Sequence, residues 1–413
     1  MAQDTQKSNK RHAPKVLFDA LLYIQDQRSP TGLSKTQKLD YEIAHSFIIC
    51  YTGSQGTFNA YRREVERLLQ FTWLIAGKSL KELRREDIEK HIYFCRKPPK
   101  AWIGLKKAPR FIDDSGMRKS NPEWRPFVAV VSKAAFKKGE RPSKDTYELS
   151  QQAVKDMLAI LSSFFNYMLQ EEYVVMNPVA MIRQKSKFIR KQQGKAKIRR
   201  LSDQQWQTVI RVAEKMAQQF PEQHERTLFI MSCLYSMYLR ISELSVTERW
   251  EPTMNDFQRD HDGLWWFTTV GKGNKERQIA VSDEMLHALK RWRKYLGLTQ
   301  LPSHVDDSPL LPKIKGKGGI TNSTFLREIV QSCFDNAIDE LKNLNEEIEA
   351  ESLMDATVHW LRHTGISDDV KIRPREHVRD DAGHGSGAIT DRYIDIELKE
   401  RHKSARKKPI QTD

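Results

Sequence analysis

Cysteine is scarce in this sequence, and the four cysteines lie far apart. The 413 residues contain Cys50, Cys95, Cys233 and Cys333. Their spacing matches neither a zinc site nor the framework of a small disulfide-rich protein. We therefore expect buried thiols in a reducing compartment.

Long apolar runs and nucleotide-binding signatures are missing as well. No apolar run approaches the ~18 residues of a membrane-spanning helix, and the segment 1–7 lacks the apolar core of a signal peptide. The Gly-x-x-x-x-Gly-Lys-Ser/Thr spacing of a phosphate-binding loop does not occur. No cluster of carboxylates indicates a two-metal nuclease. The sequence thus predicts no cofactor and no metal.

Acidic residues are outnumbered by basic ones. Lys and Arg total 69 and Asp and Glu total 54, which gives a net charge of +15 and a pI near 9.5. This balance favours a polyanionic partner, with nucleic acid as the first candidate and a membrane surface as the alternative. We expect a cytoplasmic, nucleoid-associated protein. The length predicts two domains plus tails.

The first half of the chain is predicted to be a helical domain at residues 41–182 that follows a polar N-terminal arm at residues 1–40. Apolar residues recur at three- and four-residue steps from Phe58 to Leu68 and again between Thr146 and Tyr173, which indicates amphipathic helices. The Asn-Pro pair at 177–178 ends the second of these helices.

Residues 97–145 interrupt the helical pattern. Six prolines stand there among lysines and arginines, and only the segment 127–131 has the composition of a short strand. We interpret this segment as a basic, looped insertion. It either lies along a nucleic acid or is a solvated excursion.

A basic linker at residues 183–200 follows, with nine Lys or Arg and no acid. Such a run is either solvated or neutralises phosphates. The candidate DNA-contacting residues of this run are Lys187, Arg190, Lys197, Arg199 and Arg200.

A second domain is predicted to begin near residues 201–203, where Ser and Asp signal a helix start. An apolar helix at 227–238 leads to Arg240, and Glu243 follows three residues later. Two segments rich in aromatic and β-branched residues, 264–270 and 277–281, flank the turn Gly-Lys-Gly-Asn-Lys-Glu, which predicts a β-hairpin with lysines at its tip. A helix is expected at 321–344.

The last stretch carries the residues with the most chemistry. His359 and Arg362 are three residues apart, so on a helix they face the same way and can reach one oxyanion. His384 follows Gly383, and Tyr393 stands nine residues beyond His384. A phenol can act as a nucleophile, although a single Tyr or a single His-x-x-Arg pair more often packs or faces solvent.

These segments together resemble the tyrosine recombinase (phage integrase) family. The segment Arg-Ile-Ser-Glu-Leu, the Gly-Lys-Gly-Asn-Lys-Glu-Arg hairpin, His-x-x-Arg, Gly-His and the distal Tyr occur in the family's order. The resemblance covers residues 201–400 well and 57–180 loosely. Ala382 departs from the Leu that usually precedes Gly-His, which affects packing. The residues that match the family's catalytic set are Arg240, Lys272, His359, Arg362, His384 and Tyr393.

The resemblance implies a mainly α fold. An all-α, SAM-like core-binding domain would precede an α-rich catalytic domain at 201–393 with a small antiparallel sheet. The tail at 394–413 would dock on a neighbouring protomer; its alternative is a frayed end. The implied activity is site-specific DNA recombination or integration for a mobile element, through a 3′-phosphotyrosyl intermediate. The implied partners are double-stranded DNA, a homotetramer on two sites, and accessory DNA-bending or directionality proteins.

The resemblance also implies a role for each residue. Arg240, Arg362 and His384 would hold the nonbridging phosphate oxygens. His359 would orient Tyr393 or take its proton, Lys272 would protonate the leaving 5′ oxygen, and Glu243 would hold Arg240. Two alternatives remain open, a type IB topoisomerase and a DNA-binding regulator that does not cut.

Overall fold

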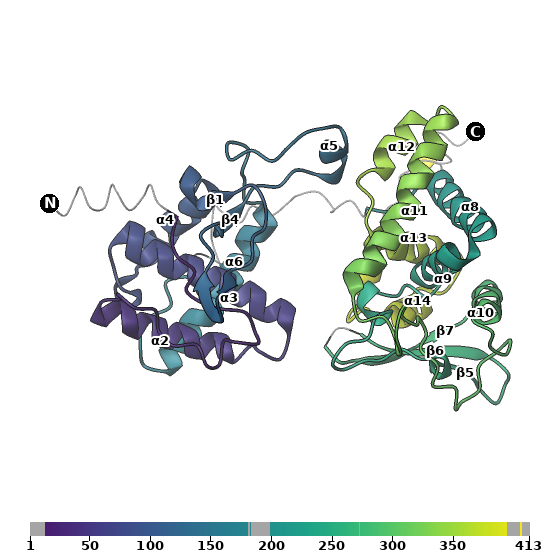
Figure 1. Cartoon of the computed structure of the whole chain (residues 1–413), viewed down its shortest axis with the longest axis horizontal. Helices are drawn as coiled ribbons and strands as arrows, with labels where there is room; N and C mark the ends of the chain where they lie inside the picture. Colours follow the sequence, from purple (N-terminus) through teal and green to yellow (C-terminus); the bar gives the residue numbers. More distant parts are fainter. Residues whose placement is uncertain (1–12, 181, 183–198, 272, 395–404, 407–413) are drawn as a thin grey trace, which may run out of the picture. The chain divides into compact units, whose positions relative to one another are not determined.

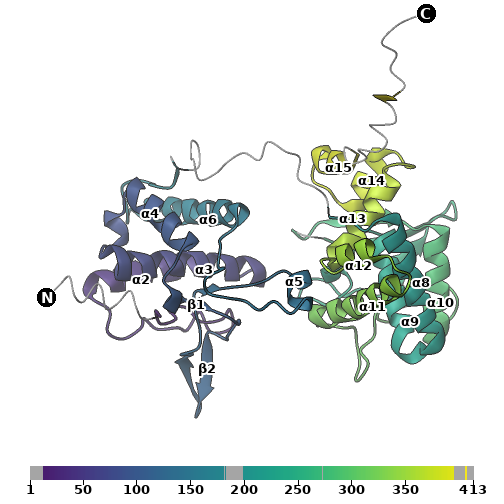
Figure 2. The same cartoon turned by 90° about the horizontal axis from the view of Figure 1, so that it is seen from above.

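The structure, a computed structural model, describes residues 13–180, 182, 199–271, 273–394 and 405–406. The chain divides into two compact units, Met1–Gln193 and Gly194–Asp413, each shown in two views (Figures 1 and 2). The division falls inside the segment expected to be a linker, 183–200. In the described part of the chain, no helix is both long and apolar enough to cross a membrane.

Four main helices build the first unit, and their apolar faces meet in one core. The helix starts follow from the sequence, because Ser34 and Ser150 are N-caps whose hydroxyls accept hydrogen bonds from backbone amides of the first turn. The predicted helical periodicity is confirmed for α3 and α6. The four helices are α2 (Lys35–Ile49), α3 (Gln55–Phe71), α4 (Arg85–Arg96) and α6 (Gln151–Gln170).

The predicted arm at residues 1–40 is wrong for its described part. Leu17, Phe18 and Ile24 are buried in the core of the first unit, and the backbone amide of Leu17 donates to Glu66 at 2.6 Å. The apolar run around Phe18 is too short to show helical periodicity, but it is long enough to insert into the core as an irregular segment. Residues 1–12 lie outside the described residues.

The insertion at 97–145 carries more structure than expected. Two short parallel strands and one β-hairpin form there. The first unit, which was expected to be purely helical, therefore also contains strands. Phe127 is fully buried, and the guanidinium of Arg67 lies 4.4 Å from its ring. The predicted strand at 127–131 is confirmed at its first two residues. The elements are β1 (Ile103–Gly104), β2 (Phe111–Asp114), β3 (Met117–Ser120), β4 (Phe127–Val128) and α5 (Lys133–Lys137).

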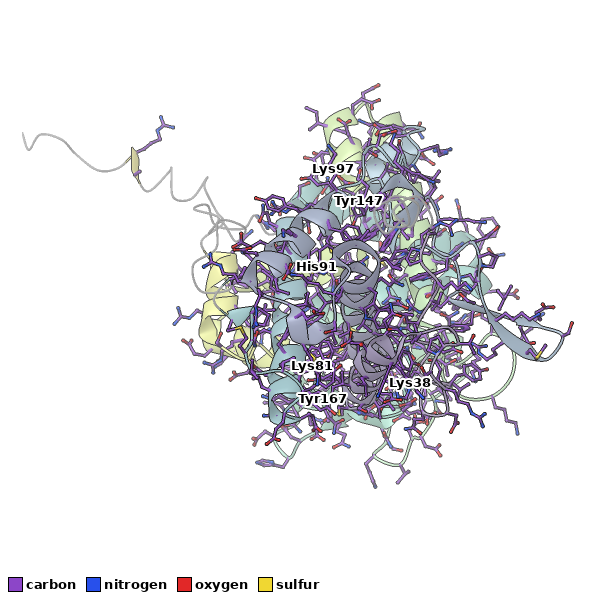
Figure 3. The ribbon with its side chains drawn as sticks, turned by 90° about the vertical axis from the view of Figure 1, so that its left-hand side faces the viewer. Lys38, Lys81, His91, Lys97, Tyr147 and Tyr167 are labelled. Carbon is purple, nitrogen blue, oxygen red and sulfur yellow. The ribbon has the colours of Figure 1, made fainter. Side chains whose placement is uncertain are left out.

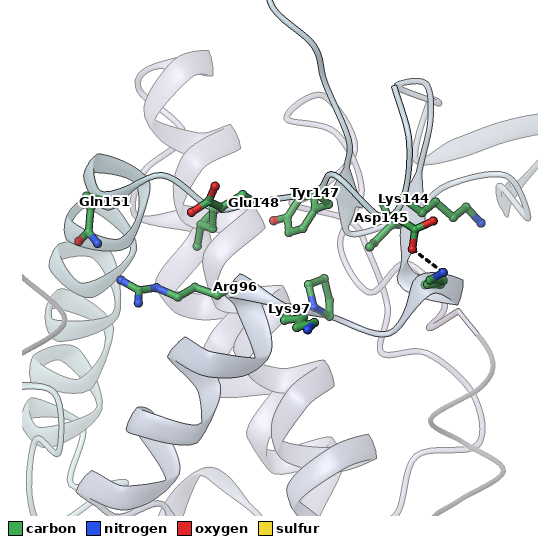
Figure 4. Close-up of a pocket in the computed structure, with 11 residues that line it drawn as sticks. Arg96, Lys97, Lys144, Asp145, Tyr147, Glu148 and Gln151 are labelled. Carbon is green, nitrogen blue, oxygen red and sulfur yellow. Dashed lines mark ion pairs between the residues drawn. The ribbon is translucent and has the colours of Figure 1, made fainter. Parts of the chain in front are cut away.

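The end of the insertion lies near the end of α4. A pocket of about 380 Å³ lies between residues 144–151 and the end of α4. Lys97 and Tyr147, labelled beside each other in Figure 3, both line it. Figure 4 shows Arg96 and Gln151 at one end of this pocket and Asp145 at the other, where Asp145 forms an ion pair with Lys100. The lining carries both signs of charge, with four basic and two acidic side chains.

The second unit packs helices against a three-stranded antiparallel sheet of order β5-β6-β7. The predicted hairpin is confirmed, with Val270 paired to Glu276 beside the turn. Strand β5 was not predicted, because its three residues are too few to show a pattern. The elements are α8 (Asp203–Gln219), α9 (Pro221–Ser236), β5 (Phe257–Arg259), β6 (Trp265–Val270), β7 (Glu276–Ala280), α10 (Asp283–Tyr295), α11 (Ser323–Asn343) and α12 (Glu347–Leu353).

Three further helices end the second unit, α13 (Val358–Asp369), α14 (Arg375–Ala382) and α15 (Gly387–Ile394). Together with Tyr238, which follows α9, they form a small separate core that contains Ile366, Val378, Ala382 and Tyr393. A Cβ at Gly365 would lie 2.1 Å from the carbonyl oxygen of Tyr235. Glycine at this position therefore lets α13 approach the end of α9 closely, which brings the residues of α13 next to Arg240.

Candidate active site

Arg240 follows a sharp turn at the end of α9. Tyr238 has a left-handed backbone with φ of 51°, which ends the helix. Arg240 then caps a short 3₁₀ helix (Ile241–Glu243). Its Nη1 atom donates to Oε1 of Glu243 at 2.9 Å. The expected role of Glu243 as the residue that holds Arg240 fits this geometry.

Arg277 of β7 completes this cluster, and sequence reasoning missed it. It donates to both carboxylate oxygens of Glu243, at 2.8 and 2.9 Å, and its Nε atom donates to the carbonyl oxygen of Asp381 at 2.9 Å. Burial alone would raise the pKa of Glu243, but the hydrogen bonds and charge of Arg277, and then those of Arg240, hold that pKa below its ordinary value. Arg277 closes the Gly-Lys-Gly-Asn-Lys-Glu-Arg segment that resembles the family's hairpin, but that pattern alone does not mark it as a site residue.

Gly383 brings His384 to the site. The residue ends α14 with φ of 63°, and a Cβ there would lie 2.8 Å from Cδ of Arg277. Both the positive φ and the close approach of the Arg277 side chain favour glycine at this position. The Nδ1 atom of His384 lies 2.8 Å from Oγ1 of Thr390. Its ring stacks on Tyr393, with centroids 5.8 Å apart and planes at 14°.

Arg362 of α13 is almost fully buried, with 5% of its surface exposed. Its guanidinium donates to the carbonyl oxygens of Tyr238 and Ala382. A guanidinium has five N–H groups, so these two bonds fix its plane and leave donors for an anion. Burial and, next, the Arg240 cation lower the pKa of Arg362 to about 9, and the side chain stays charged at neutral pH.

Tyr393 lies on α15 with 6% of its surface exposed. Its phenol oxygen is 2.6 Å from Nδ1 of His363, a residue that sequence reasoning did not select. The family resemblance assigns His359 to Tyr393, but the ring found at the phenol oxygen belongs to His363, one helical turn further along α13. No sequence pattern signals this, because the choice between the two depends on where α15 crosses α13.

His359 itself is solvent-exposed on α13. Partial desolvation, and then the cations Arg362, Arg327 and Arg240, lower its pKa. The expectation that His359 and Arg362 share one face is consistent with this interaction between their charges. The ring at the phenol oxygen of Tyr393 is nevertheless that of His363 and not that of His359.

A pocket of about 270 Å³ lies between Arg240, the hairpin and the turn after α14, and neither Arg362 nor Tyr393 is among the described residues that line it. Arg240, Arg277 and His384 line it together with Gly271 and Lys275. Lys272, the expected general acid, lies outside the described residues. Its neighbours Gly271 and Gly273 are described, and Gly271 borders this pocket.

The site carries an excess of positive charge. Burial first, and then neighbouring cations, lower the pKa of both His363 and His384 to about 4. Arg362 acts on both rings, and Arg240 also acts on His384. The same cations would favour an anion in their midst, so the electrostatics of this site suit a phosphate.

Two solved structures of a DNA recombinase are similar to the chain along nearly its whole length. The XerH site-specific recombinase bound to a palindromic difH substrate, in a post-cleavage complex, is matched with a TM-score of 0.56 at 13% sequence identity. The pre-cleavage complex of XerH is matched with a TM-score of 0.51 at 14% identity. Each comparison covers 96% of this chain and 99% of XerH.

The chain has the tyrosine recombinase fold. No protein-family model matches the sequence, and no curated protein does. The likeness therefore rests on structure, and the expected mainly α fold is confirmed. Within this recombinase fold, Arg240, Arg362, His384 and Tyr393 come from four separate segments and meet at one place.

Of the five candidate DNA-contacting residues of the linker, the structure describes two. Lys187, Arg190 and Lys197 lie outside the described residues. Arg199 is exposed, whereas Arg200 has its Nη1 atom 3.4 Å from the carboxylate of Asp368. Arg199 thus presents its charge to solvent, and Arg200 shares its charge with an acid of α13.

Proposed function

We propose that this protein is a site-specific DNA recombinase or integrase, in which Tyr393 attacks a DNA phosphate. One observation carries the proposal: a phenol whose oxygen is in hydrogen-bonding contact with a histidine stands beside two arginines and a second histidine. A nucleophile and an anion-binding cluster at one place are what phosphoryl transfer to a side chain requires.

The chemistry follows from these side chains. Attack on a phosphodiester adds negative charge to its nonbridging oxygens. Arg240, Arg362 and His384 would stabilise that charge through charge-assisted hydrogen bonds. Tyr393 would become joined to the 3′ phosphate while the 5′ oxygen leaves as a hydroxyl, with Lys272 supplying its proton. The phosphotyrosyl bond keeps the energy of the broken bond, so rejoining needs no nucleotide cofactor.

Double-stranded DNA is the proposed partner. The net charge of +15 supports binding to a polyanion, and both XerH structures were solved with a difH substrate. Strand exchange between two sites would take four protomers. The tail at 394–413, mostly outside the described residues, would dock on a neighbouring protomer, and accessory proteins would set the direction. This activity would take place in the cytoplasm, on the nucleoid.

Two other functions share this fold. A type IB topoisomerase would use the same attack but act as a monomer that relaxes supercoils. A regulator that does not cut would need no nucleophile, so the contact between Tyr393 and His363 favours an enzyme. Relaxation of a plasmid without joining of two sites would favour the topoisomerase.

Covalent capture from a random pool tests the proposal and finds the target sequence in the same experiment. The full chain is incubated with nicked duplexes whose central sequence is randomised, so that a cleaved end diffuses away. Denaturation then retains only covalently bound DNA, which is sequenced. We expect wild type to enrich one sequence through a 3′-phosphotyrosyl bond. The absence of any covalent DNA from wild type would refute the proposed function.

A further inference from the structure

We propose that His363 is the general base of this site, the group that takes the proton of Tyr393 when its oxygen attacks phosphorus. This inference rests on the proposed function and deepens it by assigning the proton transfer to a residue of α13. The Nδ1 atom of His363 lies 2.6 Å from the phenol oxygen. That distance is within the range that a direct proton transfer needs.

The direction of the hydrogen bond follows from acidity. A phenol O–H is a stronger acid, and hence a stronger donor, than the N–H of a neutral imidazole. In the contact between His363 and Tyr393 the hydroxyl therefore donates, and Nδ1 accepts with its lone pair. His363 then carries its own proton on Nε2, the tautomer that leaves Nδ1 ready to act as a base.

The groups around His363 keep it neutral before DNA binds. Arg362 and His359 face it from its own helix α13, Tyr393 faces it from α15, and His384 interacts with it from the turn after α14. Burial is the largest cause that lowers the pKa of His363, and the charges of Arg362 and His359 follow. A phosphate bound at Arg240 and Arg362 would raise this pKa again, because an anion stabilises the imidazolium. Basicity would thus increase when the substrate is in place.

The other two histidines are placed for different tasks. His384 has its Nδ1 atom on Thr390 and lies face to face with the Tyr393 ring, which suits orientation of the ring. His359 is exposed on α13 and suits a contact with phosphate. Proton transfer at His363 balances the step: the O–H bond of Tyr393 breaks, the O–P bond forms, and the P–O5′ bond breaks as the 5′ oxygen takes a proton from the general acid.

Single-turnover cleavage tests the role, with the nicked duplex that wild type captures from the random pool as the substrate. His363→Ala should slow adduct formation by ~100- to 10,000-fold, the range for loss of a general base, while binding to the same duplex is kept. His377→Ala, which alters an exposed histidine of α14, is the matched control and should cleave normally. Cleavage by His363→Ala within about threefold of wild type would overturn the proposal.

The pH dependence separates a base from a mere anchor. Without its base, Tyr393 must ionise by itself, so the rate of His363→Ala should rise about tenfold per pH unit wherever the phenol is mostly protonated. Added imidazole should restore part of the rate. His363→Asn, which keeps a hydrogen-bonding side chain, should remain as slow as His363→Ala. Full activity of the Asn variant would show that His363 only positions Tyr393, which contradicts the proposal.

A measurement without DNA guards against a variant that fails to fold. In the full wild-type chain labelled with ¹⁵N at histidine, the His363 signals should report an unprotonated Nδ1 and a protonated Nε2 at neutral pH. Tyr393→Phe should shift the Nδ1 signal, because the hydroxyl donor is gone. A proton on Nδ1 of His363 would overturn the inference. Since wild-type capture of DNA tests the proposed function separately, the two failures are distinguishable.

Discussion

The carboxylate of Glu243 links two arginines that are 37 residues apart in sequence, Arg240 and Arg277. Arg277 also reaches the carbonyl of Asp381, next to the segment that carries His384. One buried acid thereby connects the end of α9, strand β7 and the end of α14. The position of the phosphate-binding groups depends on this connection.

Replacement of Glu243 by Gln should destabilise the second unit. Glu243 and Arg277 are 1% and 9% exposed in their side chains, and loss of one partner of a buried pair costs ~3–5 kcal/mol. Glu225→Gln is the matched control, because Glu225 pairs with the more exposed Arg291, and such a pair contributes ~0–1 kcal/mol. Denaturant unfolding at pH 7 measures both free energies. Equal values for the two variants would contradict the account.

The difference in stability between wild type and Glu243→Gln should depend on pH. The folded pKa of Glu243 is lowered, so its ionised form stabilises the fold above the unfolded pKa of ~4.3. This stabilisation is lost as the pH falls from there through the folded pKa. The stability difference between wild type and Glu243→Gln should therefore be full at pH 7 and shrink below about pH 4.3. A difference that grows on acidification would be the wrong sign.

Arg240 and Arg362 should respond differently to a conservative change. Each Ala variant should lose ~100- to 1000-fold in cleavage, as when an oxyanion donor is removed. Arg362→Lys should also unfold more easily, because a lysine cannot reach both the Tyr238 and Ala382 carbonyls. Arg240→Lys should lose cleavage with little loss of stability. Adduct yields and thermal unfolding separate the two, and near-normal cleavage by either Ala variant would mean that the phosphate lies elsewhere.

Lys272→Ala tests the general acid that the family resemblance implies. The variant should cleave normal DNA poorly and cleave a substrate with a 5′-bridging sulfur well, because a thiolate leaves without a proton. Lys275→Ala, in the same hairpin, is the control, and the sulfur substrate should restore none of the cleavage that it loses on normal DNA. If the sulfur substrate fails to rescue Lys272→Ala, the acid is another group.

Charge reversal in the linker should weaken binding to every DNA sequence alike. Each lost phosphate contact should reduce the salt slope by ~0.9, because phosphate contacts give affinity rather than sequence preference. Arg199→Glu should act on binding alone, whereas Arg200→Glu would also place a second carboxylate near Asp368. Salt titrations on the captured sequence and on a scrambled duplex measure the effect. A loss confined to one sequence would indicate base reading. The set to reverse is Lys187, Arg190, Lys197, Arg199 and Arg200.

Much of the site was predictable because its parts are local. The resemblance to the family rests on such short segments, and it selected Arg240, His384 and Tyr393, which the structure brings close together. Arg277 and His363 were not found, because their roles arise from contacts across 34 and 30 residues. Periodicity does not report which of two histidines, one turn apart, meets the ring from α15.

The N-terminal half shows the same limit. The helices α3 and α6 follow from apolar spacing, but the burial of Leu17 and Phe18 does not, because an irregular segment has no period. Strand β1 could not be predicted for a similar reason, because it has only two residues and its partner β4 lies about two dozen residues further along the chain. The conformation of such segments is decided by tertiary contacts, which leave no periodic pattern in the sequence.

Covalent capture by wild type and Tyr393→Phe is the most direct test of the central claim. Both proteins should bind the captured duplex with similar affinity, because the substitution removes one oxygen. Wild type should yield denaturation-resistant DNA joined through its 3′ phosphate to Tyr393, which peptide mass spectrometry would locate, and Tyr393→Phe should yield none. Covalent DNA in the Phe variant, or joined to another residue, would contradict the account.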